Sequence, residues 1–160
     1  MRLQVELPDK GVSVRALLYA DAAPTVSRLV YESLATPLQT ETSHACFDGE
    51  EVYCFLPPFA TKPPLENRTM RPRPGELMFF HADPNEFACT ADDRLSGGSS
   101  AVYELAFMYG DVDLRHYWED GFHGSLIGRI EEGLPEFAAA CRATLNEGRT
   151  GIRISQYVDD

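Results

Sequence analysis

An imidazole and two carboxylates lie close together near the middle of the chain, at His44, Glu50 and Glu51. The residues around His44 alternate like a strand, Asp48-Gly49 is typical of a turn, and a second strand follows. A hairpin brings the end of one strand beside the start of the next, so we expect His44 to lie within reach of one carboxylate. Such a carboxylate orients the ring and raises its pKa, which suits general acid–base catalysis. The alternative is a structural His–Glu hydrogen bond.

A third carboxylate, Glu104, interrupts the long apolar stretch 101–109. In a strand its side chain shares a face with Val102, Ala106 and Met108. A carboxylate on an apolar face is costly unless it is paired. We therefore expect Glu104 either to point into a pocket at a barrel mouth, where its pKa would rise, or to have an arginine partner or a water-exposed edge position.

The segment 115–123 is rich in histidine and aromatic residues and contains Arg115, Trp118 and His123. Loops of this kind line small-molecule sites or subunit contacts, although their aromatic side chains also pack on the domain's own surface. Arg115 has the geometry to bind a substrate carboxylate through two hydrogen bonds. Together with Tyr53, which follows the two carboxylates of the hairpin, these three residues form the predicted ligand-binding set.

Neither a metal site nor a cofactor is predicted. The sequence contains no Cys-x-x-Cys, His-x-His or His-Glu-x-x-His spacing, and the shared strand face of His44 and Cys46 is a weak signal. Cys54 and Cys89 lie in apolar stretches, and Cys141 lies on the apolar face of a predicted helix. We interpret these thiols as buried and inert rather than catalytic.

The composition is that of one folded domain over residues 1–160, with 44% hydrophobic residues and a net charge of −11. A surface this acidic repels phosphate backbones and anionic lipids, so nucleic acid and membranes are not expected partners. No apolar stretch reaches the roughly 18 residues that a membrane span needs, and the first residues alternate instead of forming a signal peptide. With four widely spaced cysteines, these features predict a cytoplasmic protein with reduced thiols.

The hydrophobic pattern predicts a mainly β protein with two helices. The expected strands cover 3–7, 12–18, 42–47, 52–56, 76–81, 101–109, 125–130 and 151–155. The first helix opens at Pro24 and ends before Pro37, and the second opens at Gly133-Leu134-Pro135 with Gly148 as its C-cap. Residues 57–74 are rich in proline and 96–100 in glycine and serine, so both are expected to be loops. Strands that are apolar on both faces suit a closed barrel with helices over its ends.

Four stretches, in this order and spacing, resemble the cyclophilin-like family of small bacterial and archaeal proteins of unknown function. They are Ala23-Pro24-Thr25, then His44-Ala45 with Gly49-Glu50-Glu51-Val52-Tyr53, then Arg73-Pro74-Gly75-Glu76-Leu77-Met78, and Gly133-Leu134-Pro135 through Leu145-Asn146-Glu147-Gly148. The resemblance implies a cyclophilin-type barrel with two helices that assembles as a homo-oligomer. It implies no particular activity.

Prolyl isomerase activity is the least favoured function. Isomerases of the cyclophilin class have a Phe-His-Arg-Val-type segment and a Gln-Gly-Gly-Asp segment, and neither is present here. Our leading hypothesis is a barrel that binds a small polar or carboxylate-bearing metabolite at its mouth, near His44, Glu51, Tyr53, Glu104 and Arg115. The alternative is an oligomeric structural or protein-interaction module. Whether the chain is an enzyme stays open at this point.

Overall fold

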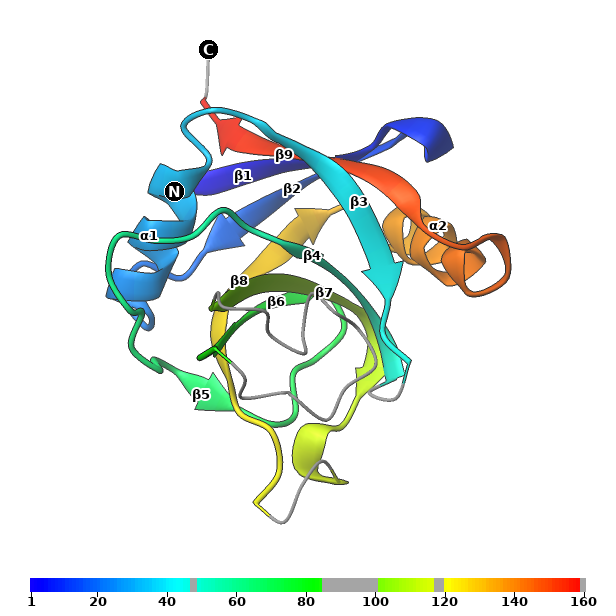
Figure 1. The fold of residues 1–160 in the computed structure, drawn as a ribbon. Helices are drawn as coiled ribbons and strands as arrows, with labels where there is room; N and C mark the ends of the chain where they lie inside the picture. Colours follow the sequence, from blue (N-terminus) through cyan, green and yellow to red (C-terminus); the bar gives the residue numbers. More distant parts are fainter. Residues whose placement is uncertain (47–48, 85–100, 117–119, 159–160) are drawn as a thin grey trace.

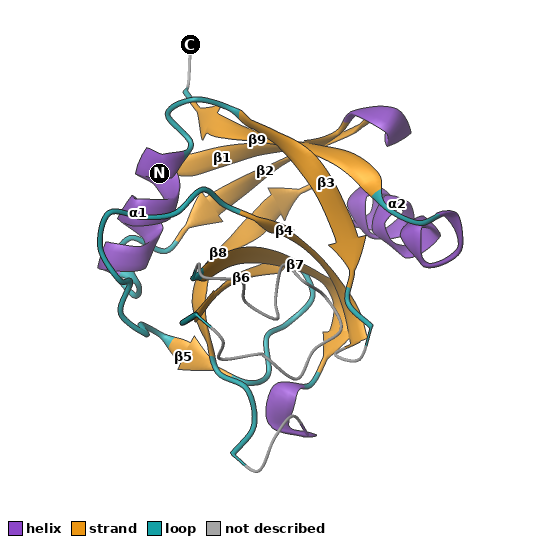
Figure 2. Cartoon of the chain, viewed as in Figure 1, coloured by secondary structure: helices purple, strands orange, loops and turns teal. Residues whose placement is uncertain are grey.

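The computed structural model describes residues 1–46, 49–84, 101–116 and 120–158. The strands are β1 (Arg2–Leu7), β2 (Val12–Leu18), β3 (Leu38–His44), β4 (Gly49–Phe55), β5 (Arg68–Thr69), β6 (Glu76–Ala82), β7 (Val102–Val112), β8 (Gly124–Glu132) and β9 (Thr150–Tyr157). The helices are α1 (Pro24–Ser33) and α2 (Leu134–Glu147), with short 3-10 turns at Pro8–Lys10 and Leu114–His116. The chain is therefore mainly β with two helices, as predicted (Figure 2).

The strands close into an antiparallel barrel (Figure 1). They follow the order β2-β1-β9-β3-β4-β7-β6-β8, and a β2–β8 pairing completes the ring, while the two residues of β5 extend β8. The first and last strands are neighbours, with Arg2 opposite Tyr157 and Val5 opposite Ile154. Closure leaves no long unpaired edge among the eight barrel strands, a device by which barrels avoid edge-to-edge association.

In the β1–β2 hairpin, the alternation of apolar and polar residues matches the inner and outer faces of the barrel wall. Leu3, Val5 and Leu7 alternate with polar residues, and all three are fully buried in the interior. The turn between the strands is a single 3-10 turn that ends at Gly11, whose φ of 64° lies in the left-handed region that glycine tolerates best. Its backbone N–H donates to the carbonyl of Pro8.

Both helices close the barrel with their apolar faces (Figure 1). Val26 and Val30 of α1 and Phe137 and Cys141 of α2 belong to the same buried cluster as the inward-facing strand residues. As far as the described residues define it, the interior is thus an apolar core. We expected a polar pocket at a barrel mouth. In the structure, apolar side chains of the two helices pack at the mouths.

The N-terminus of α1 is tied to the proline-rich segment. The residue before the helix, Ala23, offers no capping side chain. Glu66 supplies the missing acceptor, since its Oε2 receives hydrogen bonds from the backbone N–H groups of Thr25 and Val26, both at 2.9 Å. The backbone N–H of Glu66 in turn donates to the Ser125 hydroxyl at 3.1 Å. The predicted loop 57–74 is therefore anchored, and it contains the short strand β5.

Most element boundaries agree with the sequence prediction, and the exceptions are at strand ends. β3 begins at Leu38 and ends at His44, whereas we predicted 42–47; β7 continues to Val112. The glycine-serine segment 96–100 lies outside the described residues. None of the described helices is both long and apolar enough to cross a membrane.

Candidate functional site

Three neighbouring strands, β4, β7 and β6, form a surface on the outside of the barrel that carries two of the predicted carboxylates, Glu51 and Glu104. Their register places Glu51 opposite Met108, Tyr53 opposite Ala106, and Glu104 between Phe55 and Phe80. Since side chains two residues apart lie on one face, Glu51, Tyr53 and Glu104 share the face opposite to the inward-pointing residues of these strands. We call this surface the outer face.

A second apolar cluster, separate from the interior core, forms the floor of the outer face. Its buried members are Met78, Phe80, Ala106, Met108, Val112 and Leu114, and Tyr53, Met70, Phe122 and Leu126 pack against them. The sequence prediction placed Glu104 on one face with Ala106 and Met108, and the structure has this arrangement. That face is the outside of the barrel, so Glu104 does not point into the barrel interior.

Glu51 is the most deeply placed charged residue of this face. Only 2% of it is exposed, and its Oε2 atom is buried. Its strand partner Met108 is fully buried, and Tyr53 follows it on the same face. Removing a carboxylate from water costs several kcal/mol unless opposite charge or hydrogen bonds compensate. A deeply buried carboxylate beside aromatic side chains makes this position a candidate for function.

The opposite end of the outer face is open to solvent. Tyr53, Phe55 and Glu104 are all partly exposed, and the rings of Tyr53 and Phe55 meet edge to face with centroids 5.6 Å apart. Along the strands, Glu104 lies four residues from the partner of Glu51, which is roughly 13 Å. The two carboxylates therefore mark a buried end and an accessible end of one surface.

The segment around β8 closes one side of this face. The ring of Phe122 stacks on that of Phe80, with centroids 4.9 Å apart and 7° between the planes. Gly124 has no room for a side chain, because a Cβ there would lie 2.4 Å from the Phe80 ring and 2.6 Å from the Met78 methyl group. Phe80 and Phe122 were not among the predicted site residues, although both lie in the aromatic stretches that the sequence displays.

His44 lies on the other side of the sheet. It pairs with Val52, an interior residue, and its ring meets that of Tyr109 edge to face. One ring nitrogen, Nε2, lies 2.6 Å from the Tyr109 hydroxyl, and Nδ1 lies 2.6 Å from the carbonyl of Ala45. If Nδ1 carries the proton, Nε2 accepts from the tyrosine. His44 and Glu51 therefore face opposite sides of the sheet.

The other hairpin carboxylate, Glu50, is the one near His44. It forms an ion pair with Arg142 of α2 and accepts from the backbone N–H of Asp111 at 3.2 Å. The Arg142 hydrogen bond, then the Asp111 bond, lowers the pKa of Glu50. The Arg142 guanidinium also lies over the Tyr109 ring, 5.5 Å from its centroid. Burial first, and then Glu50, raises the pKa of the Tyr109 hydroxyl.

These contacts join His44, Glu50, Tyr109 and Arg142 in one barrel-end cluster. Every member has a partner inside the cluster, which fits a structural network that fastens α2 to β4 and β7. The sequence reasoning missed Tyr109 and Arg142, which are 65 and 92 residues from their partners, so no local pattern connects them.

Arg115 is already engaged with a neighbour. Its guanidinium donates to both carboxylate oxygens of Asp113, at 2.6 to 3.2 Å, and 47% of its side chain is exposed. This pairing lowers the pKa of Asp113. Arg115 follows Leu114, which belongs to the floor of the outer face, but the guanidinium itself lies at the surface.

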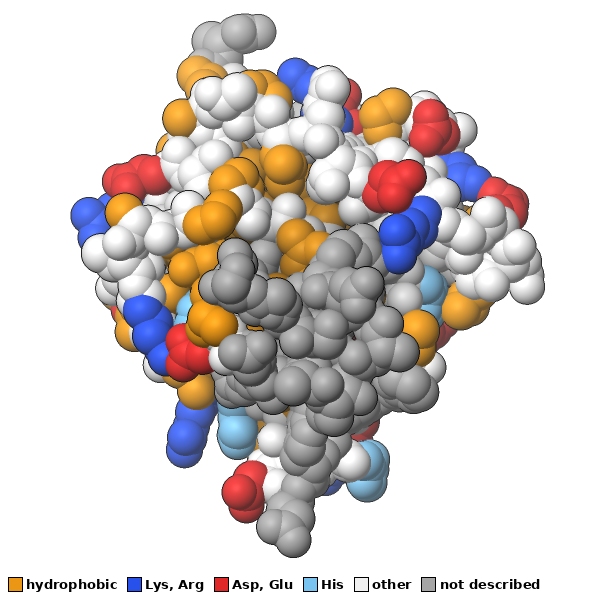
Figure 3. Space-filling model, in the orientation of Figure 1, with side chains coloured by type: hydrophobic (Ala, Val, Ile, Leu, Met, Phe, Trp, Pro, Cys, Tyr) orange, Lys and Arg blue, Asp and Glu red, His pale blue; other side chains and the backbone are white. Residues whose placement is uncertain are grey.

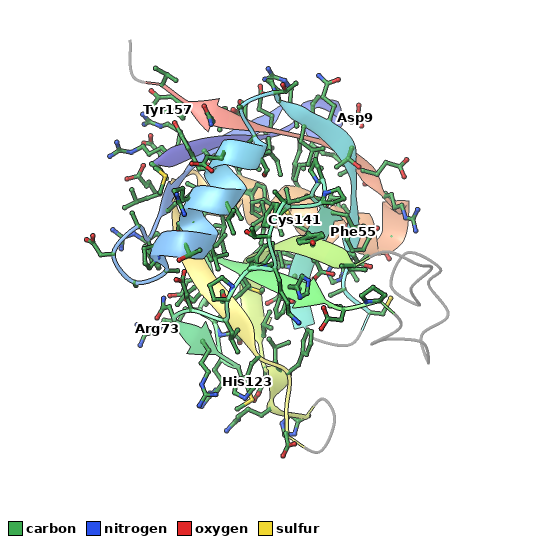
Figure 4. All side chains as sticks on the ribbon, turned by 60° about the vertical axis from the view of Figure 1, so that its left-hand side comes forward. Asp9, Phe55, Arg73, His123, Cys141 and Tyr157 are labelled. Carbon is green, nitrogen blue, oxygen red and sulfur yellow. The ribbon has the colours of Figure 1, made fainter. Side chains whose placement is uncertain are left out.

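His123 lies just before β8, at the bottom of the molecule in Figure 4. Its Nδ1 atom is buried and has no hydrogen-bond partner among the described residues. The predicted ligand-binding residue Trp118 lies outside the described residues. Of the cysteines in the described ranges, Cys54 and Cys141 are buried, and burial raises the pKa of the Cys141 thiol to about 12, whereas Cys46 is exposed. Cys89, also predicted to be buried, lies outside the described residues.

In the part of the chain that the structure describes, no three His, Cys, Asp or Glu side chains come together as a metal site. An open groove of about 550 Å³ lies between β2, β9 and the start of α2 and is lined by Arg15, Glu132, Glu136 and Tyr157 among others. Arg15 is paired with Glu132 and lies over the Tyr157 ring. Figure 3 shows charged side chains around the rim of one face of the molecule and apolar ones nearer its middle.

The closed eight-stranded barrel with two helices is a cyclophilin-like fold. Two solved structures are similar over 99% of this chain: McbB in complex with tryptophan (TM-score 0.65, 16% identity) and the Mimivirus cyclophilin (TM-score 0.54, 12% identity). The chain spans 46% of the McbB chain and 88% of the Mimivirus chain. These likenesses concern the fold alone.

The sequence itself identifies the family. Residues 5–156 match the family described as "Protein of unknown function (DUF3830)", and the chain belongs to that family. The resemblance to cyclophilin-like proteins of unknown function is thereby confirmed at the level of family and fold. A comparison with curated proteins found no match.

Proposed function

We propose that this protein binds a small polar metabolite on the outer face formed by β4, β7 and β6. The observation that carries the proposal is the buried carboxylate of Glu51 at one end of an apolar and aromatic floor whose other end is open. Small-molecule sites combine apolar and aromatic walls with a few placed polar groups in the same way. The proposal moves the ligand from the barrel mouth to the outside of the barrel, because helix side chains fill the interior.

A thermal-shift screen with polar metabolites tests this proposal. The amino acids belong in the library, since McbB, which shares the fold, was solved with tryptophan. A ligand that occupies the outer face stabilises the folded protein by an amount that grows with its concentration. Tyr53→Ala removes a partly exposed ring from the outer face and should abolish the shift, whereas Tyr31→Ala, a partly exposed ring on α1, should preserve it.

Two outcomes argue against this location. A shift that survives Tyr53→Ala in a variant whose circular dichroism spectrum is unchanged places the ligand elsewhere. A broad library that produces no shift removes the metabolite-binding proposal altogether.

Prolyl isomerase activity receives no support from the outer face. The similarity to the Mimivirus cyclophilin concerns the fold, and β4, β6 and β7 contain no arginine that could serve as the isomerase arginine. Function follows the site and not the fold. A peptide assay with an Xaa-Pro substrate is a direct check, and we expect no acceleration over the uncatalysed rate.

A further inference from the structure

The segment that joins β4 to β5 passes over the barrel as a strap, which we define as residues 57–66. It runs from the end of β4, past the N-terminus of α1, to β5 (Figure 1). Pro57, Pro58, Pro63 and Pro64 of the strap have no backbone N–H and a fixed φ angle. The strap is therefore unsuited to a strand ladder, and it is stiffer than a glycine-rich loop.

The strap contacts the barrel through few side chains. Apart from Phe59, Pro63 and Glu66, every strap residue is exposed. The ring of Phe59 stacks on that of Phe79, with centroids 5.5 Å apart and 12° between the planes, and its centroid lies 4.9 Å from that of Tyr103. Phe79 and Tyr103 belong to the interior core and are 2% and 8% exposed. Phe59 is only partly buried, so its ring separates this aromatic socket, formed by Phe79 and Tyr103, from solvent.

Polar contacts at the surface fasten the strap. Glu66 accepts from the first backbone N–H groups of α1 and donates its own N–H to the Ser125 hydroxyl. Lys62 forms an ion pair with Asp83, and 65% and 53% of these two side chains are exposed. Ion pairs as exposed as this contribute little to stability. These contacts hold the strap closed without being part of the core.

Both ends of the strap are attached to neighbouring strands. At one end, the backbone N–H of Leu56 donates to the carbonyl of Tyr103 at 2.8 Å. At the other, Asn67 has a φ of 44°, a left-handed conformation that asparagine tolerates, and its side-chain amide donates to the carbonyl of Leu126 at 2.8 Å. The strap can thus move about Leu56 and Asn67 while the strands stay paired. Regions with few buried contacts open at a lower free energy than the whole fold.

We infer that the strap is a lid that opens as a unit while the barrel stays folded, and that the socket vacated by Phe59 accepts the aromatic ring of a ligand. The chemical class follows from the present occupant, because another flat ring can stack on Phe79 as Phe59 does. The socket belongs to the interior cluster and the outer face to the second cluster, so this inference goes beyond the proposed function and does not depend on it.

Chymotrypsin tests the opening in the unmodified protein. The protease takes an aromatic ring into its own hydrophobic pocket, so it cuts the Phe59–Ala60 bond only after the Phe59 ring has left its socket. We expect cleavage at this bond in the folded protein, identified by mass spectrometry, at a rate that changes little at low urea concentrations. A rate that rises with urea as steeply as global unfolding predicts, or no cleavage at this bond, refutes the lid.

The contact between Glu66 and α1 is tested in the same assay. Glu66→Ala should raise the cleavage rate at Phe59–Ala60 about fivefold, because loss of a helix cap favours the open strap. The matched control Glu32→Ala changes an exposed glutamate of the same helix and should leave the rate unchanged. Equal rates in Glu66→Ala and the parent protein would contradict a lid fastened at Glu66.

Phe59→Ala empties the socket and tests the ligand class. Benzyl alcohol should restore part of the Tm lost in this variant, increasingly with its concentration, whereas cyclohexylmethanol, whose ring is not flat, should restore less. The control Tyr31→Ala removes another partly exposed ring packed on the same core and should not respond. Equal effects of the two alcohols on Phe59→Ala, or no effect of either, overturn the aromatic site.

A measurement on the parent protein keeps this test decisive even if Phe59→Ala does not fold. Benzyl alcohol that displaces Phe59 should lift the strap and speed hydrogen exchange of the Thr25 and Val26 amides, which donate to Glu66 in the closed strap. Exchange that stays unchanged at high concentrations of benzyl alcohol argues against the site.

Discussion

The hydrogen bond between Tyr109 and His44 joins β7 to β3 in the barrel-end cluster. The tyrosine is 3% exposed, and the atoms lie 2.6 Å apart. A hydrogen bond of this kind contributes about 1 kcal/mol to the free energy of unfolding. Tyr109→Phe keeps the ring and removes the hydroxyl, whereas His44→Ala removes the acceptor.

We therefore expect a double-mutant cycle on these two residues to give a coupling energy of about 1 kcal/mol, measured by urea denaturation. Additive effects, within about 0.3 kcal/mol, would contradict an interaction between them. The cycle is needed because His44→Ala also removes packing between the two rings. The single variant therefore reports the sum of the packing and hydrogen-bond contributions.

The ion pair between Glu50 and Arg142 leads us to expect a pH-dependent contribution to the free energy of unfolding. The pKa of Glu50 is lowered in the folded protein, mainly by the Arg142 hydrogen bond. A lowered carboxyl pKa adds stability above the unfolded value of about 4.3, and this stability is lost as the pH falls through the folded pKa. Because 38% of the Glu50 side chain is exposed, solvent keeps the contribution small.

Arg142→Gln should raise the pKa of Glu50. NMR titration of the Glu50 carboxyl carbon measures this change. The pKa should stay somewhat below its ordinary value, because the backbone N–H of Asp111 still donates to the carboxylate. The control Arg149→Gln removes a cation paired with Glu41 and should leave the titration of Glu50 unchanged. A Glu50 titration that does not move in Arg142→Gln would contradict the pairing.

At the scale of elements, α1 depends on a residue far away in sequence. Glu66→Ala removes the acceptor of the Thr25 and Val26 N–H groups and should lower the free energy of unfolding by about 1 kcal/mol, as loss of a helix N-cap does. Glu66→Gln keeps an acceptor oxygen but loses the favourable charge at the helix N-terminus, so its effect should be smaller.

Urea denaturation of both variants, beside Glu32→Ala on the exposed side of α1, is the measurement. The Glu32→Ala change should stay within about 0.5 kcal/mol of the parent protein. If Glu66→Ala is no more destabilising than Glu32→Ala, the contact does not cap the helix.

The elements were predictable because their signals are local. Alternation located β1 and β2, and Pro24 and Gly148 marked helix ends that the structure confirms. The site was less predictable, because register decides which face a side chain occupies. His44 pairs with Val52, and a shift of one residue would have brought it to the face of Glu51. Arg142 lies on α2, and no local sequence pattern indicates that this helix contacts the hairpin of β3 and β4.

For the whole molecule, the barrel depends on its last strand. β9 lies between β1 and β3 and pairs with both. A chain that ends after Arg149 lacks β9 and should lose the cooperative unfolding transition, whereas a chain that ends after Val158 should keep it. Circular dichroism during thermal unfolding distinguishes the two, and a cooperative transition in the shorter chain would contradict the dependence on β9.

Assembly is also a property of the whole molecule. The resemblance to cyclophilin-like proteins implies a homo-oligomer, and this stays a prediction. Light scattering coupled to size-exclusion chromatography should give a mass that is a multiple of the 17.8 kDa chain. A mass of one chain at all concentrations would contradict it. A Trp118→Ala variant that dissociates would locate the contact in the segment 115–123.

The pairing of β1 with β9 also governs when the protein can fold during its synthesis. Arg2 is synthesised before its partner Tyr157, which is made more than 150 residues later. At ordinary translation rates of roughly 5–20 residues per second, the first strand waits for many seconds with one edge unpaired. Folds dominated by such distant pairings close slowly. The nascent chain thus passes through a period in which an open sheet edge is accessible to chaperones or to other nascent chains.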